Sequence, residues 1–375
     1  MKIAVINNIF TPYRTFLFDF MSDFFKSQGH ELTVFYQFEK EKERHWDTEQ
    51  NTFKHNYYVS KNRISLKGDF YSFFSFNIDF LKHKFSDFDY VIFSPLMSVN
   101  NILLSYLIPK RKQIHWIESN FESTKFVGGP AKYIKKYALG QASKYLVPSE
   151  KSIDYIRAFQ CRPDSDFIKF PNLIDFNKYY EPKVSHKKNI DIRNMLQVNN
   201  DTKCILVVGE LCHRKGSDRL IDILKNVEGN YKIIVLGTGV LHEELVNQVN
   251  ELNMSHKIAF LGHLEQSESL NYFQFCDCFL HLARRDPAPL VCVEAVTSGL
   301  IMAVSNSTGN SKEVVGSLGF TFDVDSDDEL FDVVRRLVHL SEDDMLKASA
   351  CSKLLAKSNF TPDIVIKRLL DRLVS

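Results

Sequence analysis

Two acidic residues eight positions apart, Asp286 and Glu294, are the side chains of this sequence best suited to chemistry. Asp286 precedes Pro287 and Pro289, which keep the backbone extended and out of a helix. Residues 290–299 then read as a helix of small and apolar residues that ends at a glycine. Glu294 lies one turn into this helix, where its carboxylate can accept hydrogen bonds from hydroxyl groups.

The start of the same predicted helix suits an anion. The backbone N–H groups of Leu290 and Val291 have no partner within the helix, and the helix dipole adds partial positive charge there. Phosphate at the helix start and hydroxyls at Glu294 are together what a nucleotide sugar offers. A second interpretation, a buried helix whose acids cap it or face solvent, is equally open on this segment alone.

A basic loop follows the predicted strand Cys204–Val208. Gly209 ends the strand, and Arg214 and Lys215 precede a helix predicted over 218–225. An arginine fork can hold two phosphate oxygens and a lysine adds a point charge, so the pair could neutralise a leaving diphosphate. The alternative is a surface turn with solvated charges.

Glycines after the next strand would let backbone approach a ligand closely. Gly237 and Gly239 follow the predicted strand Lys232–Leu236, although any tight strand-to-helix turn could use the same spacing. His263 follows a further predicted strand, Ile258–Leu261. These residues therefore extend the candidate ligand site along the carboxyl edge of a parallel sheet.

These segments together resemble retaining glycosyltransferases of the GT-B fold, in particular glycosyltransferase family 4. Asp286 and Glu294 are similar to the Glu-x7-Glu element, with aspartate in the first position. Phe170–Asp175 is similar to the family's inter-domain hinge, and residues 209–216 are similar to its diphosphate loop. Residues 260–264 are similar to the strand end that binds the nucleobase, and Thr308–Glu313 to the turn after the Glu-x7-Glu helix, with Asn310 in place of a glycine.

The resemblance implies roles for these residues. Asp286 would bind the donor sugar, Glu294 the ribose, and Arg214 with Lys215 the diphosphate of a UDP- or GDP-linked sugar. The remaining donor contacts that it implies are Gly209, Gly237, Gly239, His263, Leu290 and Val291. It implies no metal and no cofactor beyond the nucleotide-sugar substrate, and Asp323 with Asp325 reads as a solvated turn.

The first 170 residues offer fewer candidates. Tyr13 and Arg14 resemble a variant of the family's first loop that lacks its glycine pair, and they could contact acceptor or phosphate; Arg14 could instead pair on the surface. His115 begins and Glu118 ends an apolar run at the end of a predicted central strand, where the family often places a histidine that touches the donor sugar. A buried structural histidine is the alternative for His115.

The order of apolar runs predicts an α/β protein of two Rossmann-like, doubly wound parallel-sheet domains facing a central cleft. We expect domains at 1–170 and 171–358, with a last helix at 359–375 packing back on the first domain. The remaining predicted strands are Lys2–Ile6, Glu31–Tyr36, Tyr90–Phe93, Gln113–Ile117, Tyr145–Val147, Cys278–Leu282, Ile301–Val304 and Gly319–Thr321. A Phe-rich segment, Ser65–Lys84, is expected to pack on the first sheet.

Composition narrows the setting. The net charge of +1 gives no indication of a nucleic-acid partner, and the 7 cysteines without a CxxC pair fit reduced thiols of a cytoplasmic protein. Residues 110–151 hold nine Lys or Arg against three Glu, and Ala131–Tyr145 has helical periodicity with four lysines. This stretch predicts either peripheral contact with the inner face of an anionic membrane or a plain solvated surface.

The sequence therefore predicts a retaining glycosyltransferase that moves a sugar from a nucleotide diphosphate to a hydroxyl of a glycan acceptor. The resemblance implies a lipid-linked acceptor in bacterial surface polysaccharide synthesis. Two alternatives remain: a non-catalytic GT-B partner subunit, and a nucleotide-sugar epimerase on the same fold.

Overall fold

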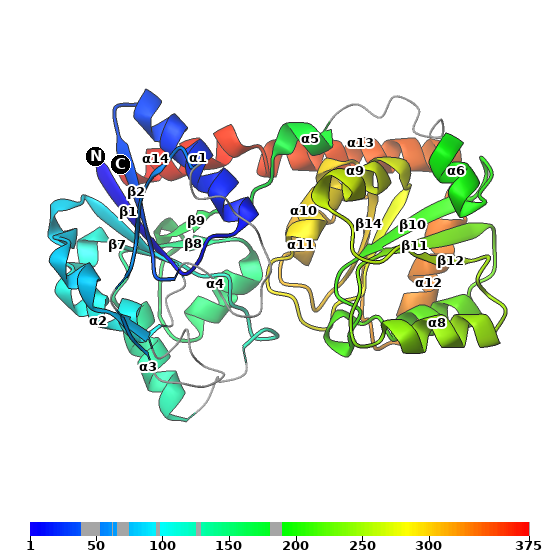
Figure 1. Cartoon of the computed structure of the whole chain (residues 1–375), viewed down its shortest axis with the longest axis horizontal. Coiled ribbons are helices and arrows are strands. Elements are labelled where there is room, and N and C mark those ends of the chain that lie inside the picture. Colours follow the sequence, from blue (N-terminus) through cyan, green and yellow to red (C-terminus); the bar gives the residue numbers. More distant parts are fainter. Residues whose placement is uncertain are drawn as a thin grey trace. The chain divides into compact units, whose positions relative to one another are not determined.

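The computed structural model describes residues 1–38, 53–61, 63–65, 75–94, 98–124, 129–180 and 190–374. The chain forms two compact units, one of Met1–Ile174 with Pro362–Ser375 and one of Asp175–Thr361 (Figure 1). The closing helix α14 (Pro362–Val374) thus belongs to the first unit. No helix in the described ranges is long and apolar enough to cross a bilayer.

The first unit is built on a seven-stranded parallel sheet in the order β3-β2-β1-β6-β7-β8-β9. Its strands are β1 (Lys2–Asn7), β2 (Glu31–Tyr36), β3 (Asn56–Val59), β6 (Tyr90–Phe93), β7 (Gln113–Trp116), β8 (Lys144–Val147) and β9 (Phe167–Lys169). A separate antiparallel pair joins β4 (Arg63–Ser65) and β5 (Ser75–Asn77). The sequence predicted five of the seven sheet strands and missed the short β3 and β9.

Helices cover both faces of this sheet because successive strand residues point to opposite sides. Ile3 and Val5 share one core with α1 (Pro12–Ser27) and α14, whereas Ala4 and Ile6 share another with the second helix group. That group is α2 (Val99–Leu107), α3 (Pro130–Leu139) and α4 (Glu150–Arg157). Short 3₁₀ turns link the elements: η2 (Ile78–Lys82), η3 (Phe85–Asp87), η4 (Lys110–Lys112) and η5 (Asp164–Asp166).

The second unit has a six-stranded parallel sheet in the order β12-β11-β10-β13-β14-β15. The strands are β10 (Lys203–Val208), β11 (Tyr231–Leu236), β12 (Ile258–Phe260), β13 (Cys278–His281), β14 (Ile301–Ser305) and β15 (Phe320–Phe322). All six were predicted, because strands buried on both faces read as continuous apolar runs.

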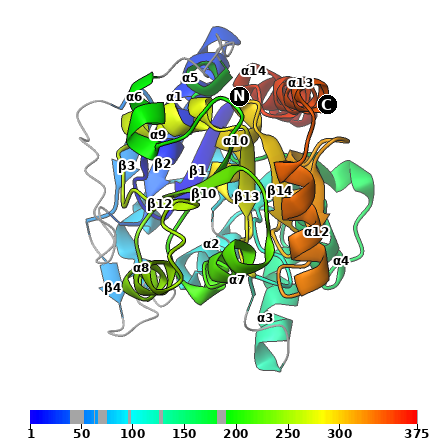
Figure 2. The same cartoon turned by 90° about the vertical axis from the view of Figure 1, so that its right-hand side faces the viewer.

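Helices lie on both sides of the second sheet (Figure 2). One side carries α7 (Arg219–Asn226), α8 (His242–Glu251) and α12 (Asp327–Val338), and the other carries α9 (Gln266–Phe275), α10 (Leu290–Thr297) and α13 (Glu342–Asn359). The shorter helices are α5 (Phe176–Tyr180), α6 (Ile190–Leu196), α11 (Ser311–Val314) and the 3₁₀ turn η7 (His213–Lys215).

The strand order of the second sheet reverses between β10 and β13. The loops that leave these two neighbouring strands therefore run to opposite sides, which is the position where open α/β sheets bind ligands. Lys215 follows β10 and Asp286 follows β13, so the topology brings both candidates to this point.

One prediction about local structure needs correction. The helix expected over Ala131–Tyr145 ends at Leu139, because Gly140 caps it and Lys144–Val147 forms β8. Lys135 is consequently buried, while Lys132 and Lys136 are exposed. Of the Phe-rich segment, residues 66–74 lie outside the described ranges; Phe80 is buried against Phe35 of β2.

Gly237 is required by a close approach of two backbone loops. It has φ 136°, and a Cβ added there would lie 2.0 Å from the carbonyl oxygen of Gly209. We expect Gly237→Ala to lower the free energy of unfolding by at least about 3 kcal/mol, because the backbone must move to relieve the clash.

Gly262→Ala is the matched control, since Gly262 has φ 70° but no atom within 4 Å of the added Cβ. It should cost only about 1 kcal/mol, the conformational strain alone. Urea unfolding followed by circular dichroism measures both. Equal losses in the two variants would contradict the proposed clash.

Candidate active site

The loops after β10 and β11 are tied together through their backbones. Leu211 N donates to Thr238 O at 3.0 Å, and Leu241 N donates to Leu211 O at 2.9 Å. A Cβ on Gly239 would lie 2.5 Å from Leu211 O, so only glycine fits this position without a shift. Gly237 in turn donates to Gly262 O at 2.7 Å, which joins the loop after β12 to the same edge.

The basic loop after β10 is fastened to the loop after β13. Arg214 O accepts from the backbone N–H groups of Arg284 and Arg285 at 3.0 and 3.2 Å. The Arg214 side chain is half exposed, and its Nη2 lies 3.0 Å from Glu210 Oε2. Arg214 therefore keeps its guanidinium at the surface, with an exchangeable solvent-side partner.

The side chain of Arg284 adds ion pairs that stabilise the loops after β10 and β13. Its guanidinium makes a two-point contact with Asp218, with both N–O distances 2.8 Å, and its Nε lies 2.7 Å from Asp325 Oδ1. Asp325 is thus an ion-pair partner rather than only a solvated turn residue. Among the residues that the structure describes, no group of three or more His, Cys, Asp or Glu could hold a metal ion.

Asp286 lies in a buried charged cluster. Only 8% of the residue is exposed, its Oδ2 forms an ion pair with Lys215 Nζ, and His281 Nε2 lies 3.7 Å away. Burial would raise the pKa of Asp286, but His281 and the charge of Lys215 outweigh it and lower the pKa to about 2. Burial lowers the pKa of His281, so that its ring is neutral near pH 7.

Glu294 has the opposite environment, although it lies only eight residues further along. Its Oε1 accepts from the Tyr179 hydroxyl at 2.9 Å, and Gln266 Nε2 lies 3.3 Å from the same hydroxyl. Burial raises the pKa of Glu294 to about 7, and hydrogen bonds from Tyr179 and Gln266 only partly offset it. A carboxylate held in this way from α5 and α9 is oriented before any ligand arrives.

The start of α10 is free of side-chain caps. Pro289 is the N-cap residue, and Leu290 and Val291 are partly exposed. Asn310 Nδ2 donates to Pro289 O at 3.4 Å, which links the turn after β14 to this helix start. Asn310 has φ −103°, so its backbone lies outside the left-handed region that favours glycine. His263 is exposed after β12.

Arg14 of the first unit is buried, contrary to the surface alternative. It is 5% exposed, its Nη2 lies 2.5 Å from Glu118 Oε1, and its guanidinium carbon lies 3.8 Å from the centre of the Trp116 ring. Thr11 caps α1 by accepting from Arg14 N at 3.4 Å, and Tyr13 remains partly exposed. The structure therefore brings Arg14 and Glu118 together at the carboxyl ends of β1 and β7.

His115 does not join them. It is fully buried on β7, packed edge-on against Phe93 and Tyr145, with its Nε2 3.3 Å from Gln113 Oε1. Burial and the nearby charge of Arg162 lower the pKa of His115 to about 3. This placement corresponds to the structural histidine alternative and leaves Glu118 as the candidate at the strand end.

Three residues of the site were missed from the sequence: Tyr179, Gln266 and His281. Tyr179 lies after the predicted hinge Phe170–Asp175 and just before residues 181–189, which are outside the described ranges, and it is 1% exposed. Its contact with Glu294 spans 115 positions and has no local signal. His281 did have one, because it ends a strand five residues before Asp286.

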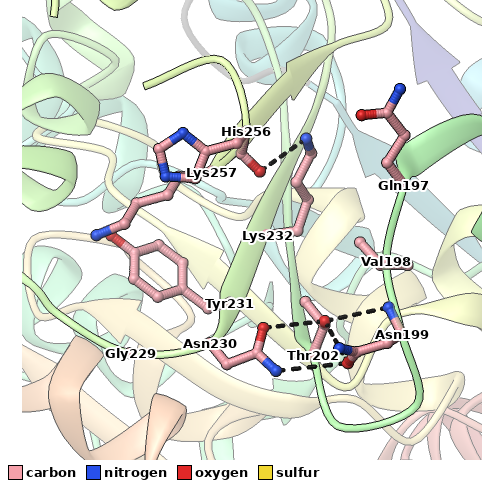
Figure 3. A pocket seen from close by; sticks show the side chains of 10 residues that line it. All are labelled: Gln197, Val198, Asn199, Thr202, Gly229, Asn230, Tyr231, Lys232, His256 and Lys257. Atoms are coloured by element: carbon pink, nitrogen blue, oxygen red, sulfur yellow. Dashed lines mark hydrogen bonds between the residues drawn. The ribbon is translucent and has the colours of Figure 1, made fainter. Parts of the chain in front are cut away.

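A separate cavity of about 470 Å³ lies at the opposite edge of the second sheet, where β10 and β11 begin (Figure 3). Its Lys232 Nζ donates to Ser255 O at 3.1 Å and His256 O at 2.9 Å, and Lys257 Nζ donates to Val227 O at 3.0 Å. Backbone carbonyls thus hold both ammonium groups, and the cavity is not part of the candidate site.

The family model that matches this chain lies within the second unit. Residues 188–350 match the family model described as "Glycosyl transferases group 1". The alpha-monoglucosyldiacylglycerol synthase of Streptococcus pneumoniae is 23% identical over 45% of this chain and 38% of its own length. Amylovoran biosynthesis glycosyltransferase AmsD of Erwinia amylovora is 21% identical over 84% and 86%.

Solved structures match the whole chain. Anabaena HepE in complex with UDP has a TM-score of 0.76 at 16% identity and covers 100% of both chains. WaaG, a glycosyltransferase involved in lipopolysaccharide biosynthesis, has a TM-score of 0.66 at 14% identity, with 99% of each chain covered. The chain has the GT-B fold. The predicted fold class is thereby confirmed, and the family match with the named relatives supports a transferase of class EC 2.4.

The chain spans 35%, 38% and 49% of the first three curated relatives that it matches. The third, at 24% identity, is a Campylobacter jejuni enzyme whose name specifies transfer of N-acetylgalactosamine to a diphospho-undecaprenol acceptor. These names describe the relatives and not the activity of this chain.

The raised pKa of Glu294 predicts a pH-dependent stability. Below about pH 4.5 the carboxyl is protonated in both the folded and the unfolded states, and above about pH 7 the folded protein bears the cost of a buried charge. We expect Glu294 to remove about 3 kcal/mol of stability as the pH rises through this window. The difference in unfolding free energy between wild type and Glu294→Gln, from urea titrations at pH 4.5 to 8, measures it. Parallel profiles would contradict the raised pKa, and Glu228→Gln is the control at an exposed position.

The buried pair predicts a large effect of neutralising Asp286. Asp286→Asn leaves the Lys215 ammonium without its counter-charge and should lower the free energy of unfolding by about 3 kcal/mol or more at pH 7. Asp325→Asn breaks an exposed pair, with 61% side-chain exposure against 11% for Asp286, and should cost less than about 1 kcal/mol. Similar losses in both variants would show that burial does not set the strength of the pair.

Proposed function

We propose that the chain is a retaining glycosyltransferase of family 4 type that uses a UDP- or GDP-linked sugar. The observation that carries the proposal is the oriented carboxylate of Glu294, held by Tyr179 one turn into the uncapped helix α10. This arrangement suits a ribose whose diphosphate lies at the helix start. It falls within the residues that match the group 1 glycosyl transferases.

The diphosphate would be neutralised by protein groups rather than by metal. Arg214 is exposed and can exchange Glu210 for phosphate oxygens, whereas Lys215 is shared with Asp286. The partial positive charge of the α10 start adds to both. These charges would stabilise the negative charge that develops on the leaving diphosphate as the bond to the sugar breaks.

Asp286 is the acid proposed to meet the sugar. Its low pKa keeps it ionised at physiological pH, so it can only accept hydrogen bonds from sugar hydroxyls. No side-chain base is required in this proposal, because an oxygen of the departing diphosphate takes the proton of the acceptor hydroxyl on the face that it leaves. The product then retains the anomeric configuration.

The acceptor proposed is a lipid-linked glycan of bacterial surface polysaccharide synthesis. Support comes from the relatives, whose names specify monoglucosyldiacylglycerol synthesis, a diphospho-undecaprenol glycan and amylovoran biosynthesis. Arg14 with Glu118, at the carboxyl edge of the first sheet, is the candidate contact for the acceptor or for phosphate.

A thermal-shift screen with UDP, GDP, ADP and their sugar conjugates tests the donor site. A ligand present at about 100 times its dissociation constant adds about 2.7 kcal/mol of stability. We expect one nucleotide to raise the unfolding midpoint, and Glu294→Ala to abolish the shift without loss of folding. Glu228→Ala, an exposed glutamate just before β11 at the other edge of the sheet, should keep the shift.

Turnover separates an enzyme from a non-catalytic partner subunit. Proton NMR of the donor with purified protein and a lipid-linked glycan should show a new glycosidic bond of the donor's own anomeric configuration. Inversion would exclude the retaining mechanism. Nucleotide binding without transfer to any acceptor or hydrolysis would favour the non-catalytic subunit, and conversion of the donor sugar without an acceptor would favour an epimerase.

A further inference from the structure

Exposed apolar side chains gather on helices α2 and α3 of the first unit. These residues, which we term the α2–α3 patch, are Leu103 (44% exposed), Tyr106 (63%), Leu107 (64%), Tyr133 (75%), Ile134 (47%) and Tyr137 (38%). Their spacing puts each group of three on one side of its helix. The rings of Tyr106 and Tyr137 stack at 4.9 Å between centres, which joins the two groups. Both helices lie at the lower end of the first unit in Figure 1.

Packing of the unit does not require these side chains. The α2 helix buries Leu104 against the sheet and α3 buries Ala138 and Leu139. The patch lies on the other sides of both helices, where single apolar residues would be unremarked but a contiguous group marks an interaction surface. Three of its six members are tyrosines, whose apolar ring and polar hydroxyl suit a boundary between water and hydrocarbon.

The charged side chains on the two segments that carry the patch have one sign. Lys110 and Arg111 lie three and four residues beyond the end of α2 at Leu107, and Lys132 and Lys136 lie on α3; all four are exposed. Neither Val99–Lys112 nor Gly129–Lys144 contains an aspartate or a glutamate. The patch thus combines exposed tyrosines and leucines with basic side chains, and its two segments contain no carboxylate. This combination suits an anionic lipid surface.

Two exposed leucines of α13 lie among charges of both signs. Leu346 and Leu354 of α13 are 72% and 70% exposed, but α13 begins with Glu342, Asp343 and Asp344. The same helix also carries Lys347, Lys353 and Lys357, so the two leucines provide a control of comparable exposure on a segment of mixed charge.

We propose that the α2–α3 patch docks this protein on an anionic bilayer, with its tyrosines and leucines among the lipid headgroups and its cations against their phosphates. The inference rests on the proposed function, since docking would bring the chain to a membrane-borne acceptor. Vesicle binding is nevertheless measured without donor or acceptor, so the two proposals can fail separately.

Vesicle flotation of the whole chain tests the proposal. Neutral vesicles contain phosphatidylcholine alone, and anionic vesicles contain about 30% phosphatidylglycerol in addition. Binding is measured at about 50 and 500 mM salt, because salt screens the electrostatic part. Wild type should float with the anionic vesicles at low salt and much less with the neutral ones. Arg111→Gln/Lys132→Gln/Lys136→Gln should bind roughly one hundredfold more weakly, at about fivefold per cation removed. Tyr106→Ser/Leu107→Ser/Tyr133→Ser should lose at least about tenfold even at low salt.

The control Leu346→Ser/Leu354→Ser should bind vesicles as wild type does, and all variants should keep the nucleotide-induced thermal shift. Absence of wild-type flotation, or unchanged binding by the serine variant of the patch, would overturn the proposal. Sedimentation velocity tests whether the patch instead binds a second copy of the chain. A wild-type protein that is dimeric and does not bind vesicles, and that the serine variant converts to a monomer, would make the patch a dimer interface.

Discussion

The candidate site depends above all on the buried ion pair of Lys215 and Asp286. Neither charge can be left alone in this place, because an uncompensated buried charge costs several kcal/mol. The two residues follow β10 and β13, the strands at which the sheet reverses its order, and Arg214 O accepts two backbone hydrogen bonds across the same junction. The pair thus fixes where the basic loop ends and where α10 begins, and with them the places of Arg214 and Glu294.

The same constraint separates the two acids chemically. Asp286 has a cation in contact and a pKa of about 2, whereas Glu294 has only neutral donors in contact and a pKa of about 7. One carboxylate is therefore a permanent charge and the other a hydrogen-bonding group close to its titration point. Burial acts on both in the same direction, so the contacts with His281 and Lys215, which Glu294 lacks, decide the difference. The eight-residue spacing of the two acids does not reveal this asymmetry.

The sequence predicted most of the fold and about half of the site, for identifiable reasons. Parallel strands buried on both faces read as apolar runs, and residues just after them converge at one sheet edge, which located Lys215, Asp286 and the glycine loops. The strands β3 and β9 are too short to show a hydrophobic pattern from which a strand could be predicted. His115 was misleading because a residue within a fully buried strand has no solvent face; only a position past the strand end, such as Glu118, reaches the edge. The role of Tyr179 could be recognised only from the tertiary structure, because its contact with Glu294 spans 115 positions of the chain.

Both units contain an ion pair at the carboxyl edge of the sheet, but the carboxylates of the two pairs differ in exposure. Each brings a cation and a carboxylate together at the carboxyl edge of its sheet, Arg14 with Glu118 in the first and Lys215 with Asp286 in the second. The side chain of Glu118 is 30% exposed against 11% for Asp286, and Arg14 rests on the Trp116 ring, which stabilises the guanidinium without a counter-charge. Glu118 can therefore leave its partner for a ligand at lower cost than Asp286 can. The first pair is suited to exchange, and the second to holding its loops in place.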